Sequence, residues 1–206
     1  MKPKGLISDA VEILRQIPRV SEKTALNMIE HFLSDTIAWA DFKKVMEVMM
    51  SSGYCICGNF ASDANQQYDG KNLCEYCRED NREGIVLIPN IRTISKMEDI
   101  LPGRYWYHVI TATDTQSETE TIHALVKNIQ HKMSYDANPI SVVSALGSDA
   151  LSNEVFLTII DTLKDVFGDS VKVSKLPIGI PMDTPIQKVG DATLRAVLMM
   201  LDSNNR

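Results

Sequence analysis

The sequence lacks the features that mark membrane proteins, secreted proteins and the common nucleotide-binding enzymes. No apolar run approaches the roughly 20 residues of a membrane helix, and Lys2, Lys4 and Asp9 interrupt the apolar stretch that a signal peptide needs near the start. We therefore expect a cytoplasmic protein with no membrane partner. Neither a Gly-rich phosphate loop nor a dinucleotide-binding fingerprint is present, so an ATPase is not expected. The four histidines have no metal-ligand spacing with one another.

Cysteine is scarce and confined to one short stretch. Cys55 and Cys57 form a C-x-C pair, residues 58–73 follow, and Cys74 and Cys77 form a C-x-x-C pair. Two such turns can close a tetrahedron of four thiolates around one structural Zn²⁺, leaving no open position for chemistry. The alternatives are two disulfides, which need an oxidising compartment, or free buried thiols. No cysteine is left over once zinc is bound, so cysteine catalysis is not expected.

Composition and charge set further bounds. The 206 residues suffice for one large or two small domains, and 44% apolar content is that of a globular protein. The formal charge of −6 argues against a surface that is basic all round. Any contact with nucleic acid must therefore come from a local basic patch.

The first quarter of the chain reads as helices. Apolar residues at helical spacing predict a helix over 6–17 that Pro18 ends, and a second helix with Ser21 as its N-cap. Two short helices joined by such a turn outline either a DNA-binding helix-hairpin-helix or a plain helical hairpin. A third helix over 36–51 ends at Gly53, and its inward face should hold Ile37, Trp39, Phe42, Val45, Val48 and Met49.

Beyond the cysteines the pattern changes to short apolar runs that alternate with helices. Strands are expected over 84–89, 105–111, 140–146 and 170–176, and helices over 117–132, 152–167 and 191–201. This alternation predicts an α/β fold with a parallel sheet covered on both faces. The predicted core strand residues are Val86, Leu87, Ile88, Val109, Ile110, Val142, Val143, Val171 and Val173.

The order of these parts is similar to that of the RecR family of bacterial recombination mediators. The string IPRVSEKTALNMIEHFL resembles the helix-hairpin-helix of that family, with matches at Pro18, Lys23, Ala25, His31 and Leu33. CGNF at 57–60, the C-x-x-C pair and Arg82 resemble its zinc knuckle. YHVI at 107–110, GIP at 179–181 and DATLRAV from Asp191 are similar to segments of its Toprim domain and C-terminal region.

The resemblance implies an α/β (α+β overall) protein in four parts. These are a helix-hairpin-helix-like region (1–53), a four-cysteine zinc knuckle (54–83), a Toprim-like α/β domain (84–176) and a C-terminal segment with a helix (177–206). The implied function is that of a non-enzymatic DNA-binding scaffold or clamp in recombination and repair. Its expected partners are DNA, RecO- and RecF-like proteins, and further copies of itself in a homodimer or homotetramer.

Several positions depart from the family pattern. Arg19 and Ser21 stand where hairpin glycines are expected, and Tyr54 stands where the first knuckle cysteine would be. The carboxylates that hold Mg²⁺ in Toprim enzymes are replaced by Pro89, Leu151 and Asn153. One alternative is therefore an interaction subunit that has lost DNA loading. A Mg²⁺-dependent nuclease or primase is the weaker alternative, since Glu98, Asp149 and Glu154 are expected to be solvated surface acids.

The candidate DNA contacts are basic residues at or near the hairpin. Arg19 lies in the turn and Lys23 in the first turn of the second helix, while Lys2 and Lys4 precede the first helix. Such charges neutralise phosphates without reading bases, which predicts sequence-independent binding. The competing interpretation is that they are ordinary solvated helix-surface charges. His108, between aromatic residues, is expected to be a packed strand histidine.

Overall fold

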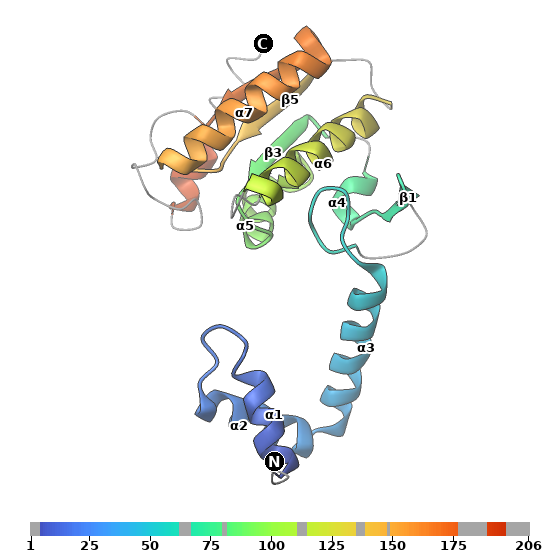
Figure 1. Ribbon diagram of the computed structural model, residues 1–206, viewed down its shortest axis with the longest axis vertical. Coiled ribbons are helices and arrows are strands. Elements are labelled where there is room, and N and C mark those ends of the chain that lie inside the picture. Colours follow the sequence, from blue (N-terminus) through green and yellow to red (C-terminus); the bar gives the residue numbers. More distant parts are fainter. Residues whose placement is uncertain are drawn as a thin grey trace. The chain divides into compact units, whose positions relative to one another are not determined.

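The computed structural model describes residues 5–61, 67–79, 82–110, 115–134, 139–147, 149–176 and 189–196 (Figure 1). The chain divides into two compact units, Met1–Ser51 and Ser52–Arg206. None of the described helices is long and apolar enough to cross a membrane. Lys2, Lys4 and the GIP motif at 179–181 lie outside the described residues.

The N-terminal unit begins with a helical hairpin, as predicted. Helix α1 (Leu6–Leu14) ends three residues earlier than its apolar pattern suggested, because the N–H groups of Gln16 and Ile17 bond in tight turns before Pro18. Helix α2 (Glu22–Ser34) starts at the predicted N-cap, where the Ser21 hydroxyl accepts from the N–H of Thr24 at 3.1 Å.

Helix α3 (Thr36–Ser52) forms as predicted, but its apolar face is not buried. Ile37 is 74% exposed, and Trp39, Phe42, Val45 and Val48 are also exposed, while Met49 is partly buried. Their predicted inward placement is therefore wrong. The rings of Trp39 and Phe42 pack with Phe32 of α2, but the described residues of this unit provide no second layer for the rest. The helix ends at Gly53, whose φ of 68° is a left-handed cap conformation.

The second unit contains a parallel sheet. Among the described residues its strands are β3 (Gly84–Ile88), β4 (Trp106–Val109), β5 (Ile140–Ser144) and β6 (Val171–Lys175), in the order β4-β3-β5-β6. Continuous apolar runs suit strands that are buried on both faces. Gly84 is required by the sheet, since a Cβ there would lie 2.5 Å from the carbonyl oxygen of Ser141.

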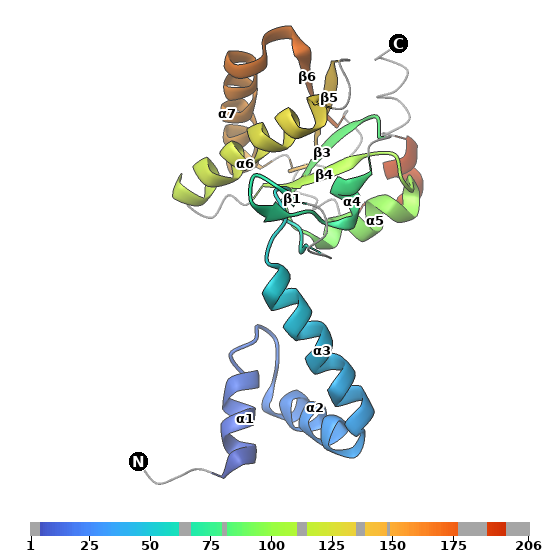
Figure 2. The same ribbon diagram turned by 90° about the vertical axis from the view of Figure 1, so that its right-hand side faces the viewer.

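Helices cover both faces of this sheet, which confirms the predicted α/β class (Figure 2). Helix α5 (Arg92–Ile100) and the helical residues 191–196 pack on one face through Ile94, Met97 and Leu194. Helices α6 (Thr115–Met133) and α7 (Ala150–Phe167) pack on the other through Leu125, Ile129 and Ile159. A 3-10 turn, η1 (Gly168–Ser170), links α7 to β6. The predicted continuation of the last helix over 197–201 lies outside the described residues.

A small cysteine-containing lobe lies at the start of this unit. Its regular elements are the hairpin strands β1 (Gln67–Tyr68) and β2 (Lys71–Asn72) and the short helix α4 (Glu75–Arg78). We call residues 54–79 the knuckle. It packs as a cluster with buried Ile56 and Leu73 around the four cysteines.

Candidate metal centre

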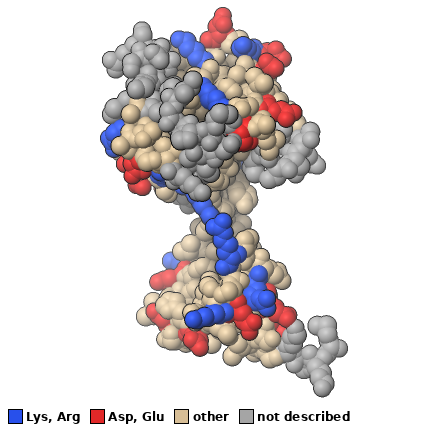
Figure 3. Space-filling view, turned by 90° about the vertical axis from the view of Figure 1, so that its left-hand side faces the viewer, with Lys and Arg blue, Asp and Glu red and all other residues tan. Residues whose placement is uncertain are grey.

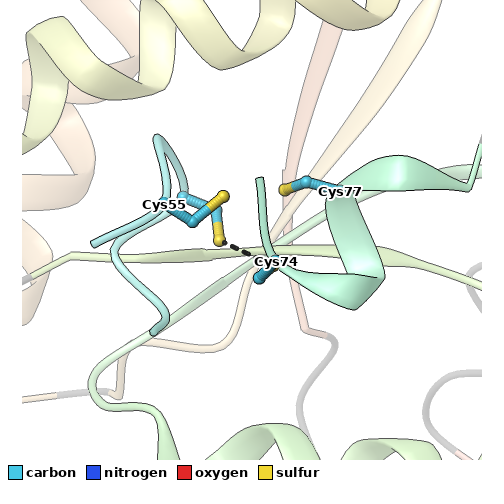
Figure 4. A group of neighbouring side chains, drawn as sticks. Cys55, Cys74 and Cys77 are labelled. Atoms are coloured by element: carbon cyan, nitrogen blue, oxygen red, sulfur yellow. Dashed lines mark hydrogen bonds between the residues drawn. The ribbon is translucent and has the colours of Figure 1, made fainter. Parts of the chain in front are cut away.

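Two tight turns bring the four cysteines together. In the first, the N–H of Cys55 donates to the carbonyl of Asn59 at 2.8 Å, and Gly58 turns the chain with φ of 83°. In the second, Cys74 lies at the N-terminus of α4 and its carbonyl accepts from the N–H of Cys77 at 3.1 Å. Figure 4 shows the side chains of Cys55, Cys74 and Cys77 gathering from these two segments.

The geometry of the four sulfurs fits a tetrahedral metal ion. All four lie within 4.8 Å of one another, and the sulfurs of Cys57 and Cys74 are 3.6 Å apart. Four sulfurs at about 2.3 Å from one zinc ion would be separated by about 3.8 Å. The cysteines are free thiols, each at most 2% exposed. Among the described residues they are the one group of three or more His, Cys, Asp or Glu side chains that could hold a metal.

The electrostatics of the cluster also favour a cation. Hydrogen bonds from the neighbouring thiols lower the pKa of Cys55, so that one thiolate forms readily. The interaction with Cys55, followed by the other sulfurs and burial, raises the pKa of Cys57 well above its usual value. Four buried thiols therefore cannot all ionise by themselves. A divalent cation would remove this conflict, because coordination deprotonates a thiol outright.

The knuckle is built against the edge of the sheet. Strand β4 is an edge strand, and the N–H of Val109 donates to the carbonyl of Cys57 at 2.8 Å. The indole N–H of Trp106 donates to the carbonyl of Glu79 at 2.7 Å. Gly58 is needed at this contact, since a Cβ there would lie 3.0 Å from the Cβ of Val109. The knuckle thus covers hydrogen-bonding groups that an open edge would expose.

Arg82 links the end of the knuckle to helix α5. Its side chain is 2% exposed and bonds the carboxylates of Glu98 at 2.7 Å and Glu79 at 2.6 Å. The expectation that Glu98 is a solvated acid is therefore wrong, because its side chain is only 19% exposed. Burial acts to raise the pKa of Glu98, but hydrogen bonds from the Gly103 N–H and Arg82 outweigh it and the pKa is lowered.

Helix α6 contributes three contacts to the knuckle that the sequence did not reveal. Lys127 pairs with Asp69, the ring of His131 packs 4.2 Å from that of Tyr68, and the ammonium of Lys132 contacts the carbonyl of Cys77. None of the three was singled out from the sequence as a knuckle contact. Lys127 and His131 are four residues apart and so are neighbours on the helix surface, which was the available signal for these two; Lys132 does not share that spacing.

The other titratable residues singled out from the sequence serve structural roles or lie on the surface. His108 is packed in β4, as predicted; its Nε2 lies 3.1 Å from the carbonyl of Thr121, and burial lowers its pKa to about 4. Asp149 caps α7 by accepting from the N–H of Ser152 at 2.9 Å. Glu154 is exposed. Glu98 thus pairs with Arg82, whereas Asp149 binds the N-terminus of α7 at a separate place.

The candidate DNA residues of the hairpin are exposed. Arg19 has a left-handed backbone with φ of 69°, so the turn keeps a glycine-like conformation although a large side chain occupies it. Lys23 lies in the first turn of α2, and neither side chain has a charged partner among the described residues. Figure 3 shows basic and acidic side chains interspersed on the visible face. DNA contact at Arg19 and Lys23 stays a prediction.

The fold and site define a protein in which a four-cysteine centre is built onto the edge of a parallel α/β sheet. No protein-family model matches the chain. The chain is 22% identical over 214 residues to "Recombination protein RecR" of Orientia tsutsugamushi strain Boryong, with 99% of this chain and 98% of that protein covered. The same identity and coverage hold for "Recombination protein RecR" of strain Ikeda. The similarity supports a diverged RecR-like protein.

Proposed function

We propose that the protein is a DNA recombination and repair factor that acts as a DNA-binding scaffold or clamp and not as an enzyme. The observation that carries this proposal is the similarity to two recombination proteins over 99% of the chain. Each shared string is short, so their common order along both units counts for more than any one motif. The clustered cysteines are compatible with the zinc knuckle that the resemblance implies.

The proposed metal is one structural Zn²⁺ per chain. Its ligands would be Cys55, Cys57, Cys74 and Cys77, whose sulfurs are close enough for one ion. Four sulfur ligands leave no position for water or substrate, so the ion would stabilise the knuckle and supply no reaction chemistry. Metal analysis of freshly purified protein should find one zinc per chain. Protein that is folded and free of zinc would contradict this assignment.

The proposed DNA contacts are basic side chains of the hairpin. Arg19 and Lys23 are exposed and lie on the two sides of the N-cap Ser21. Lys2 and Lys4, outside the described residues, would extend the same patch. Because Arg19 replaces a glycine, phosphates would be reached by side chains and not by close approach of backbone N–H groups. Binding would then be independent of base sequence and sensitive to salt.

The proposed assembly is a homodimer or homotetramer that encircles DNA and acts with RecO- and RecF-like partners. Support comes from the apolar surface of the N-terminal unit. A groove of about 340 Å³ between its helices is lined almost entirely by apolar side chains: Ala10, Ile13, Leu14, Ile29, Phe32, Leu33 and Trp39. Such surface is more than a small monomeric unit normally exposes. Light scattering should give a mass above that of one chain.

The second candidate function is an interaction subunit that keeps the assembly but has lost DNA loading. It is favoured by Arg19 in the hairpin turn and by the formal charge of −6. Fluorescence anisotropy with single- and double-stranded DNA at about 50 and 200 mM salt separates the two. Affinity that falls steeply with salt is expected for the clamp, whereas no measurable affinity at either salt would favour the interaction subunit. Mg²⁺-dependent cleavage of the same DNA would instead indicate a Toprim-type nuclease.

A further inference from the structure

The knuckle lies along an edge strand of the parallel sheet and contacts it at several points. β4 stands at one end of the strand order β4-β3-β5-β6. The indole N–H of Trp106 donates to the last carbonyl of the knuckle at 2.7 Å. The ring of Tyr76 packs edge-on against that of Tyr107, with 5.7 Å between their centres. The N–H of Val109 donates to the carbonyl of Cys57, which is itself one of the four clustered cysteines.

The hydrogen bond at Val109 uses a backbone group that points away from the sheet. Successive residues of a strand direct their N–H groups to opposite edges. The N–H of Ile110 donates inward, to the carbonyl of Ile88 in β3 at 2.9 Å. The N–H of Val109 therefore faces outward, where the carbonyl of Cys57 accepts it at 2.8 Å. The knuckle thus occupies a hydrogen-bonding position that another strand could use.

The sequence of this strand is of the kind that pairs with copies of itself. Residues 105–110 read YWYHVI, and all but His108 are aromatic or β-branched. The segment contains no Gly, Pro, Lys, Arg, Asp or Glu. Six-residue segments with high β propensity, low charge and no proline stack into shared sheets when they are exposed. In the folded chain all six side chains are covered, and the most exposed of them, Val109, is 8% exposed.

The opposite edge strand is protected in a different way. β6 carries Lys172 and Lys175 within its five residues. Lysines on an edge strand oppose pairing with another strand, because the second strand would have to bury or crowd their charges. β4 has no such charge in its sequence. Its protection comes instead from the knuckle that lies along it.

We propose that β4 is a self-association surface that the metal-loaded knuckle keeps covered, and that it pairs antiparallel with β4 of a second copy when the metal is lost. This inference rests on the proposed zinc site. Small metal-bound lobes are folded by their ion, so loss of the ion frees the turns that hold Cys57 and Tyr76. The outer edge of β4 is then uncovered. An antiparallel pair about a two-fold axis sets the same uncharged segment against itself, which is why a second copy is the partner.

The two edge strands provide a matched pair of variants. Val109→Pro removes an outward-facing N–H from β4. Val173→Pro does the same in β6, because the N–H of Leu176, three residues later, faces inward and donates to the carbonyl of Ser144. Proline is tolerated on an edge strand where the replaced N–H faces away from the sheet. A general effect of proline in a strand would appear in both variants, whereas blocked pairing of β4 would appear only in the first.

The test removes zinc from the full chain with a chelator, in the presence of a thiol reductant so that the released cysteines cannot cross-link. Mass is followed by light scattering at a series of protein concentrations. The metal-free parent and metal-free Val173→Pro should reach about twice the mass of the zinc-loaded protein or more, since each pairing joins two copies. Metal-free Val109→Pro should keep the zinc-loaded mass.

The outcomes separate this inference from the proposals beneath it. The zinc-loaded mass tests the proposed assembly, and the rise on zinc removal tests β4. Folded parent protein that is purified without zinc would overturn the metal site and this inference together. A zinc-loaded parent whose mass does not change on zinc removal would overturn the inference alone, as would equal association of metal-free Val109→Pro and Val173→Pro.

Amide hydrogen exchange decides if Val109→Pro is not recovered folded. In the dilute metal-free parent, the amide of Val109 should lose its protection while the inward-facing amide of Ile110 keeps it. Protection of Val109 that survives zinc removal would show that the edge stays covered, and would overturn the inference.

Discussion

The two units of the chain bury their apolar side chains to very different extents. In Ser52–Arg206 the central strand residues Ile85, Val86, Leu87 and Ile88 are all 0% exposed. In the described part of the N-terminal unit only Val11 and Ala25 are buried, while Ile37 is 74% exposed. A unit of about 50 residues has too little interior to bury much of its surface. The second unit therefore buries its own apolar core, whereas the N-terminal unit leaves apolar surface exposed that a partner could cover.

The largest expected effect comes from breaking the metal centre. Cys74→Ser should abolish zinc binding and unfold the knuckle, because structural zinc contributes about 10–16 kcal/mol of apparent free energy in small domains at neutral pH. Trp106, whose indole N–H bonds the carbonyl of Glu79 at the end of the knuckle, should then become solvated and its fluorescence should shift to the red. Zinc content and the melting temperature are the measurements. Both remaining at parental values would end the structural-metal assignment.

A matched pair of isoleucine substitutions measures the contrast between the units directly. Ile129 of α6 is 0% exposed and Ile37 of α3 is 74% exposed. Ile129→Ala should lower the free energy of unfolding by about 2–5 kcal/mol through the cavity it leaves. Ile37→Ala should change it by less than about 0.5 kcal/mol. Urea unfolding followed by circular dichroism gives both values.

The same pair can also show whether a partner covers α3. If the loss of unfolding free energy caused by Ile37→Ala grows with protein concentration, a second copy of the chain packs on this helix. If Ile37→Ala and Ile129→Ala lower the unfolding free energy equally in dilute protein, the difference in burial between the two units is contradicted.

The sheet unit should also carry an acid-sensitive component of stability at His108. Burial lowers the pKa of this histidine to about 4, whereas an unfolded histidine titrates near about 6.5. Below about pH 6.5 the unfolded chain binds a proton that the folded chain excludes until about pH 4, so stability falls as the pH is lowered between these values. The lost stability reaches about 3 kcal/mol.

The variant His108→Gln should show a flatter stability profile between these pH values. His123→Gln, which replaces an exposed histidine of α6, is the control. Urea midpoints measured across this range compare the three proteins. A slope for His108→Gln that matches the parent would mean that the ring binds its proton over the same pH range in the folded and the unfolded chain.

The parts of the fold that the sequence predicted are those set by local pattern. Strands β3 and β5 coincide with continuous β-branched and apolar runs, which are typical of the interior of a parallel sheet. The cysteine cluster followed from two short spacings, since neighbouring sulfurs must face one point. The N-cap at Ser21 depends only on its own hydroxyl and on the first turn of α2, where the N–H of Thr24 donates to it. The strands, the cap and each cysteine pair are decided within a few residues.

The parts that the sequence did not predict depend on contacts between distant segments. Lys132 and Cys77 are 55 residues apart, and a lysine in a helix normally indicates a solvated face. The side chain of Glu98 is only 19% exposed and pairs with the buried Arg82, which is 16 residues away in the sequence. The apolar pattern of α3 correctly indicated a helix with one apolar face, but periodicity does not say which surface covers that face.

A smaller gain in stability is expected at the strained hairpin turn. Arg19 has φ of 69°, a conformation that costs a residue with a Cβ about 1 kcal/mol. Arg19→Gly should therefore stabilise the N-terminal unit by somewhat less than about 1 kcal/mol, because glycine also gains freedom in the unfolded chain. Arg19→Ala keeps the strain and serves as the control. Thermal melting in which the glycine variant is no more stable than the alanine variant would count against a strained turn.

The salt dependence of DNA affinity tests most directly whether the N-terminal unit is the DNA-contacting part. The double variant Arg19→Ala, Lys23→Ala is compared with Lys164→Ala, Lys172→Ala, which removes two exposed charges from the sheet unit. If the hairpin binds phosphates, the first variant should lower the slope of log affinity against log salt by about two per chain, and the second should leave it unchanged. A hairpin variant with the affinity and slope of the parent would contradict DNA contact at this unit.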